Sequence, residues 1–200
     1  MAKTAIRTVD QRWRAGKSRR VKCPRASHSN IGIGRGNKRD IVALIKASNH
    51  DRVESLIPIR HGRMLQSEFA FFRGTAALQA HDLRRAPASG IIVQACGDCH
   101  LLNFGGFASP ERTLIFDIND FDETFPGPWE WDLKRLGASL VLAARDRRFS
   151  SKIADKAVAA AAQSYRERIS EFAAMRVLDS WYAQLSADIV KQHFRNADPL

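Results

Sequence analysis

The segment 93–136 most constrains what this 200-residue chain can fold into. It places a short turn carrying Asp98 and Asn103 before a β-type run at 113–118, and a cluster of carboxylates at 119–123 follows that run directly. Magnesium takes hard oxygen ligands and keeps several waters, so one or two carboxylates, an amide oxygen and substrate phosphates complete a site. This order of residues is therefore typical of a Mg²⁺-dependent phosphoryl-transfer site.

Composition sets the outer limits of the interpretation. Hydrophobic residues make up 44% of the chain, which is enough for a core. No apolar run reaches the length of about eighteen residues that a transmembrane helix needs. The N-terminus lacks the apolar segment of a secretory signal, so the cytoplasm is the expected compartment. In such a chain, the three cysteines Cys23, Cys96 and Cys99 argue against a disulfide framework.

The formal charge of +11 lies almost entirely at one end of the chain. Residues 1–40 contain 12 Lys and Arg against 2 Asp and Glu, whereas the remainder contains 20 against 19. We expect residues 1–39 to form a basic, flexible arm, and residues 40–200 to form the folded domain. Such an arm is a solvated tail, a non-specific binder of nucleic acid or anionic surfaces, or a segment that docks on a part of the protein absent here. Amphipathic mitochondrial targeting is a weaker interpretation.

Helical periodicity covers most of residues 40–200. Asp40 is a plausible N-cap for a short helix at 41–48, and Pro58 breaks any helix within 51–60. Apolar residues recur at steps of three and four between Leu65 and Leu83, which predicts a helix over 64–84.

Further helices are expected at 129–147, at 152–175 after a serine cap, and at 178–193. Two short apolar runs, 91–95 and 113–118, read as strands around turns and predict a small hairpin. The expected fold class is therefore α+β, mostly helical, with one small β-hairpin.

The sequence Cys96-Gly97-Asp98-Cys99-His100 matches the C-x-x-C-H pattern of covalent haem attachment, and its cysteine pair is also found in zinc and redox sites. Haem attachment requires export, for which no signal is present. A zinc site needs four ligands, and the chain has no second cysteine pair. Two chance cysteines that flank a functional Asp98 account better for the pattern.

The spacing of Asp98 and Asn103 is that of the kinase catalytic loop, in which an Asp accepts the hydroxyl proton and an Asn holds Mg²⁺. The alternative is that both side chains only cap turns through hydrogen bonds to the backbone. Arg60, Arg63 and Arg73 present a similar choice between neutralising phosphate charge and forming surface or structural ion pairs.

A family resemblance adds to this reading over residues 60–145. The chain closely resembles the bacterial domain of unknown function 2252 family. The same segment looks like the aminoglycoside and choline phosphotransferase branch of the protein-kinase-like superfamily, whose C-terminal catalytic lobe the expected fold resembles. The residues that carry the resemblance are RHGRM (60–64), EFAFFRG (68–74), QACGDCHLLNFGGFASPER (94–112) and FDINDFDETFPGPWEWDLKRLGASL (116–140).

The resemblance implies a role for each matching residue. Asp98 resembles the catalytic base, and Asn103 resembles a metal ligand that also serves the nucleotide cofactor. Asp120 resembles the Mg²⁺-binding Asp after the strand, and Asp117 is its rival because it also ends a β run. The implied activity is transfer of the ATP γ-phosphoryl group to a hydroxyl acceptor, either a small molecule or a protein.

Two further residues receive supporting roles from the same resemblance. Asp132 resembles the buried Asp that ties a helix to the catalytic loop, and His100 is expected to shape that loop.

The chain also departs from the kinase pattern. Kinases need a Gly-rich lid and a strand Lys to hold the nucleotide, yet neither precedes Asp98, and Gly32, Gly34 and Gly36 have the wrong spacing. Family members continue past Leu200, so the resemblance implies a truncated chain that lacks the nucleotide-binding lobe. The alternative function is a non-catalytic pseudoenzyme or remnant whose basic arm binds a partner or nucleic acid.

Overall fold

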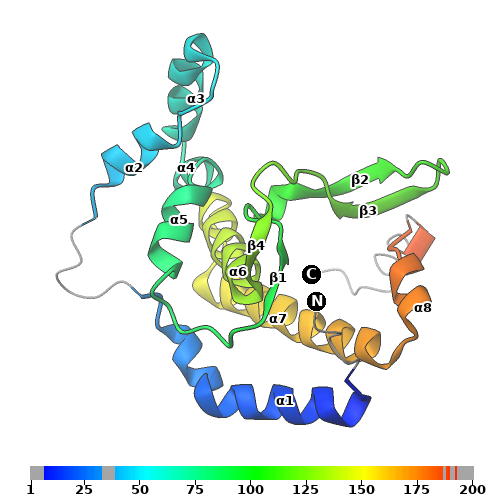
Figure 1. Cartoon of the computed structure of the whole chain (residues 1–200). Helices are drawn as coiled ribbons and strands as arrows, with labels where there is room; N and C mark the ends of the chain where they lie inside the picture. The colour runs from blue at the N-terminus through cyan, green and yellow to red at the C-terminus, as the bar shows by residue number, and fades with distance from the viewer. Residues whose placement is uncertain (1–6, 33–38, 187, 190–191, 193–200) are drawn as a thin grey trace.

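The computed structural model describes residues 7–32, 39–186, 188, 189 and 192, and this part of the chain is α+β and mostly helical, as expected (Figure 1). Its α-helices are α1 (Val9–Lys22), α2 (Ile41–Ala47), α3 (Ile57–Met64), α4 (Glu68–Arg73), α5 (Ala76–Leu83), α6 (Trp129–Asp146), α7 (Ser151–Ala174) and α8 (Val177–Tyr182). Short 3-10 helices are η1 (Arg25–Ser29), η2 (Glu54–Leu56) and η3 (Leu101–Asn103). Strands are β1 (Ile92–Ala95), β2 (Phe104–Ala108), β3 (Leu114–Ile118) and β4 (Phe125–Pro128).

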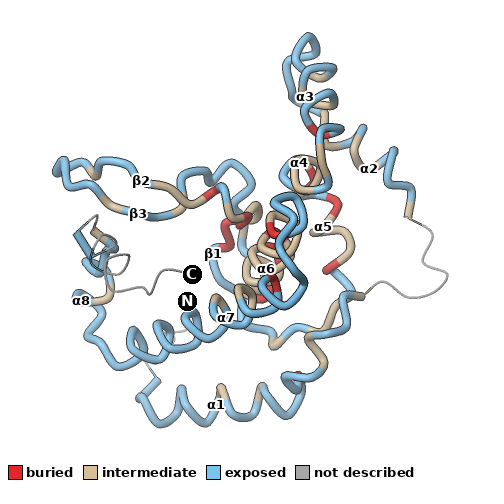
Figure 2. Tube along the Cα trace, turned by 180° about the vertical axis from the view of Figure 1, so that it is seen from behind, coloured by how far each residue is buried: buried red, intermediate tan, exposed pale blue. Residues whose placement is uncertain are grey.

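Helix α6 lies at the centre of the molecule and contacts α4, α5, α7, β1 and η3 (Figure 1). Buried residues gather around α6 and the elements that touch it, whereas α1, much of α7 and the β2–β3 hairpin are largely exposed (Figure 2). The two largest fully buried side chains are polar, Arg135 and Ser139, both on α6. Because buried polar groups need partners, this core is organised by hydrogen bonds as well as by apolar packing.

Several predicted helices are confirmed, and their N-caps explain where they begin. The carboxylate of Asp40 accepts a hydrogen bond from Ala43 N at 2.9 Å, and α2 begins at the next residue. Ser150 caps α7 in the same manner through Ile153 N at 3.4 Å. Capping side chains satisfy backbone N–H groups that have no partner within the helix.

The single helix expected over 64–84 is wrong. The segment instead forms the end of α3, then α4 and α5, separated by breaks near Ser67 and Gly74. Ser67 begins α4 as an N-cap through Ala70 N at 3.0 Å, and at Gly74 a Cβ atom would lie 2.7 Å from Met64 Sδ. Pro58 does not break a helix either, because it occupies the first turn of α3, where proline is tolerated.

The strand pairing also differs from the prediction. The runs at 91–95 and 113–118 do not pair with each other, because β1 pairs antiparallel with β4 and β2 pairs antiparallel with β3. Strand β4 contains Pro126 and Pro128, and β2 contains Gly105 and Gly106, so neither resembles a strand in sequence. Two small sheets therefore replace the one expected hairpin.

The helix predicted at 178–193 is interrupted, because residues 183–186 are not helical whereas residues 188, 189 and 192 are. Helix α8 ends at Tyr182, and residues 183–186 run beside β3, where Leu185 O accepts a hydrogen bond from Phe116 N at 2.8 Å. The remaining part of the prediction falls partly outside the described residues.

The described part of the predicted arm is largely helical. Thr8 and Gln11 form a capping box that begins α1, and Arg19 Nη1 donates to Ser89 O at 2.7 Å. Cys23, at the end of α1, is only 5% exposed, so this end of the helix is joined to the rest of the fold. Reciprocal capping explains why a segment without a strong apolar stripe is helical.

The predicted boundary between an arm and a domain near residue 39 stays a prediction, and Gly34 and Gly36 lie outside the described residues. Among the helices that the structure describes, none has the length and apolar character needed to cross a membrane.

Candidate functional site

The turn between β1 and η3 has a backbone that only glycine can supply at its second position. Gly97 has a φ angle of +83°, and a Cβ there would lie 2.0 Å from Glu123 O. The carboxylate of Asp132, in the first turn of α6, accepts hydrogen bonds from Cys96 N at 2.7 Å and Gly97 N at 3.0 Å. The start of α6 therefore fixes the turn from which Asp98 projects.

Asp98 is held by a buried guanidinium. Its Oδ1 atom accepts a hydrogen bond from Arg135 Nε at 2.5 Å, and Oδ2 lies 3.8 Å from His100 Nε2. The side chain of Asp98 is 20% exposed, whereas that of Arg135 is 2% exposed. One carboxylate oxygen is thus fixed by the interior, while the partial exposure leaves the group within reach of a ligand.

Arg135 is the functional residue that sequence reasoning missed. Its Nη1 atom donates to Gln79 Oε1 at 2.7 Å, Nη2 donates to Phe72 O at 2.8 Å, and the guanidinium lies 4.3 Å from the centre of the Phe72 ring. A signal was present, because Arg135 follows Asp132 by three residues and such residues share one helix face. Both side chains accordingly reach the same turn from α6.

Asn103 joins the two halves of the site. It is 6% exposed, and its Nδ2 atom donates to Asp98 O at 3.0 Å and to Asp120 O at 3.1 Å. These bonds use the amide nitrogen, so the amide oxygen is the atom of Asn103 suited to a metal ion. The structure therefore brings Asp98, Asn103 and Asp120 into one hydrogen-bonded group.

The two candidate carboxylates after β3 are placed differently. Asp120 Oδ1 accepts a hydrogen bond from Asp122 N at 3.1 Å, and the backbone of Asp120 is tied to Asn103. Asp117 lies within β3 opposite Gly105, and its carboxylate accepts from the adjacent Ile118 N at 2.8 Å. Because its backbone is bonded to Asn103, Asp120 is a better candidate metal ligand than Asp117.

The oxygen atoms of Asn103 and Asp120 are the candidate donors for a metal ion. Among the described residues, no group of three or more His, Cys, Asp and Glu side chains is arranged to hold a metal ion. A magnesium ion shared with substrate phosphates needs only one or two protein oxygens and fills its other positions with water and phosphate. The carboxylate of Asp120 and the amide oxygen of Asn103 are oxygen donors of the type that magnesium takes.

His100 is buried close to Asp98. It is 7% exposed, and its Nδ1 atom has no hydrogen-bond partner among the described residues. Burial lowers the pKa of His100, Asp98 acts in the opposite sense, and Arg135 and Arg73 lower it further. His100 is therefore a neutral imidazole near pH 7.

The cysteines of the turn are free thiols packed inside it. Cys96 and Cys99 are 4% and 6% exposed. A hydrogen bond between the two thiols lowers the pKa of Cys96, and the same bond together with burial raises the pKa of Cys99. Cys96 Sγ also lies 3.6 Å from Asp120 O, so this thiol packs between the two halves of the site.

The nearby arginines divide between structural and exposed roles. Arg60 Nη2 donates to Gly74 O at 2.6 Å and Nη1 donates to Asn49 Oδ1 at 2.8 Å, and these bonds connect α3 with its neighbours. Arg63 and Arg73 are exposed, and Arg73 is close enough to His100 to influence its pKa.

Comparison with known proteins gives one match. The family described as "Uncharacterized protein conserved in bacteria (DUF2252)" matches residues 52–199, which is most of the chain. The chain belongs to this DUF2252 family. No curated protein and no solved structure matches it. The DUF2252 match contains the turn, the carboxylates after β3 and helix α6, so the candidate site lies wholly within the family region, whereas α1 lies outside it.

Proposed function

We propose that this DUF2252 chain is a Mg²⁺- and ATP-dependent phosphotransferase that acts on a hydroxyl group. The observation that carries the proposal is the position of Asn103, whose amide nitrogen joins the backbones of Asp98 and Asp120 at 3.0 and 3.1 Å. A candidate base and two candidate metal ligands thus belong to one hydrogen-bonded group. Pre-organised positioning of this kind supplies much of the rate in phosphoryl transfer.

Each residue has a role that its contacts allow. Asp98 orients the acceptor hydroxyl and takes its proton through the carboxylate oxygen that Arg135 does not hold. Arg135 keeps the carboxylate in one orientation. The amide oxygen of Asn103 and the carboxylate of Asp120 hold the metal ion, which neutralises phosphate charge when bound.

Binding of Mg²⁺-ATP is tested first, by thermal unfolding. The chain should melt at a higher temperature with Mg²⁺ and ATP, by about 5–10 °C at a hundredfold excess over Kd. Asn103→Ala and Asp120→Asn should abolish the shift, whereas Asp117→Asn is the matched control that should keep it. Loss of the shift in Asp117→Asn alone would reverse the assignment of the two aspartates.

Catalysis is tested separately from binding. Transfer of the γ-phosphoryl group to a panel of hydroxyl compounds should disappear in Asp98→Asn, while its nucleotide-dependent thermal shift remains. A variant that melts normally, binds nucleotide and still transfers phosphate at the wild-type rate would refute the role of Asp98. Failure of the wild-type chain to bind Mg²⁺-ATP would remove the proposal itself.

A second candidate function rests on α1. This helix contains six Lys and Arg residues and one acidic residue, Asp10, and its Trp13 is 63% exposed with Lys17 Nζ 5.7 Å from its ring centre. Exposed cations with an aromatic ring between them suit single-stranded nucleic acid, in which phosphates pair with cations and bases stack. We infer an accessory nucleic-acid-binding surface here.

The measurement for α1 is the fluorescence anisotropy of a labelled oligonucleotide across a salt series. Binding should weaken steeply as salt rises. It should also weaken in a variant that combines Arg14→Gln, Lys17→Gln and Arg20→Gln. Affinity that does not change with salt, or that survives the triple substitution, would exclude this surface.

A further inference from the structure

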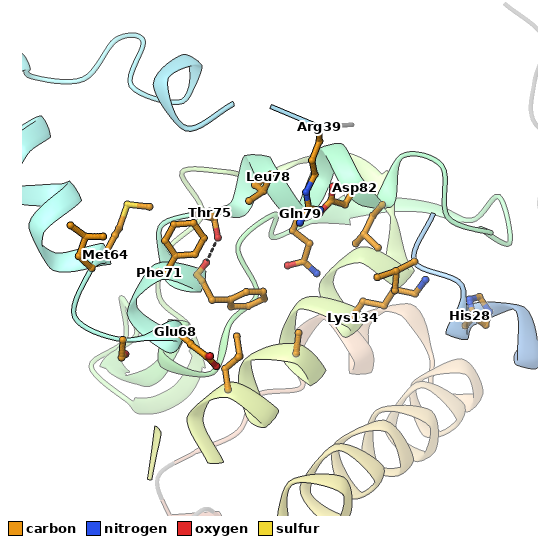
Figure 3. Close-up of a pocket in the computed structure, with 17 residues that line it drawn as sticks. His28, Arg39, Met64, Glu68, Phe71, Thr75, Leu78, Gln79, Asp82 and Lys134 are labelled. Atoms are coloured by element: carbon orange, nitrogen blue, oxygen red, sulfur yellow. Dashed lines mark hydrogen bonds and ion pairs between the residues drawn. The ribbon is translucent and has the colours of Figure 1, made fainter. Parts of the chain in front are cut away.

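A cavity of about 690 Å³ lies between α3, α4, α5 and α6 and the loop after η1 (Figure 3). Its volume falls within the range of about 300–1,000 Å³ that is usual for small-molecule sites. None of the phosphotransferase residues proposed above lines it. The cavity is therefore a separate candidate binding site.

The body of the cavity is apolar. Its walls include Phe71 and Phe72 from α4, Leu78 and Leu83 from α5, and Leu142 from α6. Side chains of this kind favour a ligand that loses apolar surface to them, because removal of such surface from water is the main driving force for binding. The ligand should accordingly carry a hydrocarbon or aromatic body.

The charged side chains that line the cavity differ in whether they already have a charged partner. Arg39 and Asp82 form an ion pair with each other, and Figure 3 shows their side chains pointing together. Glu68 lies 3.9 Å from Arg145. These three liners, Arg39, Asp82 and Glu68, already have charged partners of their own.

Lys134 differs from them. Its ammonium lies 3.5 Å from Asn30 O, and no carboxylate among the described residues lies within ion-pair distance of it. The side chain is only partly exposed, and burial lowers the pKa of Lys134, against the weaker influence of Glu130. In Figure 3 it lies near His28 at one end of the cavity, whereas Met64 lies at the other. A partly buried cation without an anionic partner favours an anion at that end.

We propose that the cavity binds an apolar carboxylic acid, with the hydrocarbon body between α4, α5 and α6 and the carboxylate at Lys134. The apolar walls select the body, and the ammonium selects the charge. This binding does not depend on the proposed phosphotransferase function.

The cavity is also linked to the candidate site. Phe72 and Gln79 line it, and both hold Arg135, which in turn holds Asp98. A ligand would therefore contact the side chains that fix the orientation of Asp98. Regulation of catalysis through this link rests on the proposed function, whereas binding alone is tested below.

The experiment is isothermal titration of the full chain with decanoate. Decanol and decyltrimethylammonium, which have the same hydrocarbon length, serve as the uncharged and the cationic probe. Decanoate should bind most tightly, and octanoate roughly 15-fold more weakly because two methylene groups are lost. Lys134→Gln should reduce decanoate affinity roughly tenfold and leave decanol affinity unchanged.

A cavity-filling variant tests the location. Ala138 lines the cavity from α6, so Ala138→Phe should abolish binding by occupying the space. Ala160→Phe and Lys156→Gln, both at exposed positions of α7, are the matched controls and should bind as the wild type does. Circular dichroism confirms that each variant folds.

Each negative outcome has a separate meaning. The absence of decanoate binding to the wild-type chain would overturn the proposal. Equal affinity for decanoate and decanol, or an unchanged affinity for decanoate in Lys134→Gln, would refute the proposed contact between the carboxylate and Lys134. Unchanged binding in a folded Ala138→Phe variant would refute the cavity as the site. All three readouts are independent of phosphoryl transfer.

Discussion

Replacement of Arg135 by methionine is the most direct test of the structure around Asp98. Methionine keeps much of the side-chain volume but removes the charge and the donors. The variant loses the 2.5 Å hydrogen bond to Asp98, the bond to Gln79 Oε1 and the bond to Phe72 O. Because Arg135 is 1% exposed, little water can reach the buried acceptors on Gln79 and Phe72 that lose its hydrogen bonds.

The expected cost follows from what is left behind. Removal of one partner of a buried ion pair costs about 3–5 kcal/mol, because the other charge stays buried without compensation. The Asp98 side chain retains 20% exposure, so water recovers part of its solvation and the lower end of the range applies. We expect a loss of about 3 kcal/mol in the free energy of unfolding, which lowers Tm by about 6–12 °C for a domain of this size.

Urea unfolding followed by circular dichroism measures this loss. The matched control is Arg145→Met on the same helix, because the ion pair of Arg145 with Glu68 is 3.9 Å long and its side chains are 67% and 74% exposed. Exposed pairs contribute about 0–1 kcal/mol, so this control should lie near the wild type. A cost below 1 kcal/mol for Arg135→Met, or one equal to that of the control, would refute the buried pair. Arg135→Lys should not restore stability, because the single ammonium group of lysine cannot reach the three acceptors that the planar guanidinium group contacts.

Two further predictions concern the turn. Gly97→Ala should destabilise the fold by more than about 2 kcal/mol through strain at positive φ and the clash with Glu123 O, whereas Gly16→Ala, which has open space within α1, should stabilise it by about 0.5–1 kcal/mol. In urea unfolding, the free energy of unfolding should decrease for Gly97→Ala and increase for Gly16→Ala. No change in the free energy of unfolding for Gly97→Ala would contradict the turn geometry. For His100, the pKa in the folded chain lies below the ordinary value of 6.5. Below pH 6.5 the unfolded chain therefore binds a proton that the folded chain does not, so stability should fall from pH 7 towards the folded pKa and level off beneath it. His100→Gln should flatten this part of the stability profile, and an unchanged profile would show that other groups cause it.

The proximity of Asp98, Asn103 and Asp120 could be predicted from the sequence because it is local. Asp98 and Asn103 share one turn, and Asp120 follows the next predicted strand, so their proximity required only that the chain fold back once. Arg135 was missed because its partners lie far away in sequence, at Gln79 and Phe72. No periodic pattern records such a contact.

The strand pairing also depends on contacts that the sequence pattern does not record. The runs around Val93 and Ile115 have the β-branched composition of strands and were found, whereas β2 and β4 are rich in glycine and proline and were not. Each strand pairs with its partner through backbone hydrogen bonds between segments. The strand propensity of a segment does not say which other segment will lie beside it.

The sequence alone determined the mostly helical character of the chain, the cap at Asp40, a serine cap at Ser150 or Ser151, and the concentration of polar side chains between β1 and α6. These features depend on residues within a few positions of one another. The tertiary structure alone decided that α6 is the centre of the fold, that Arg135 is buried against Asp98, and that a cavity is lined by Phe72 and Gln79, which hold Arg135. The physical reason is that burial and ion pairing arise from contacts between distant segments, and only the packing of those segments determines which groups lose water.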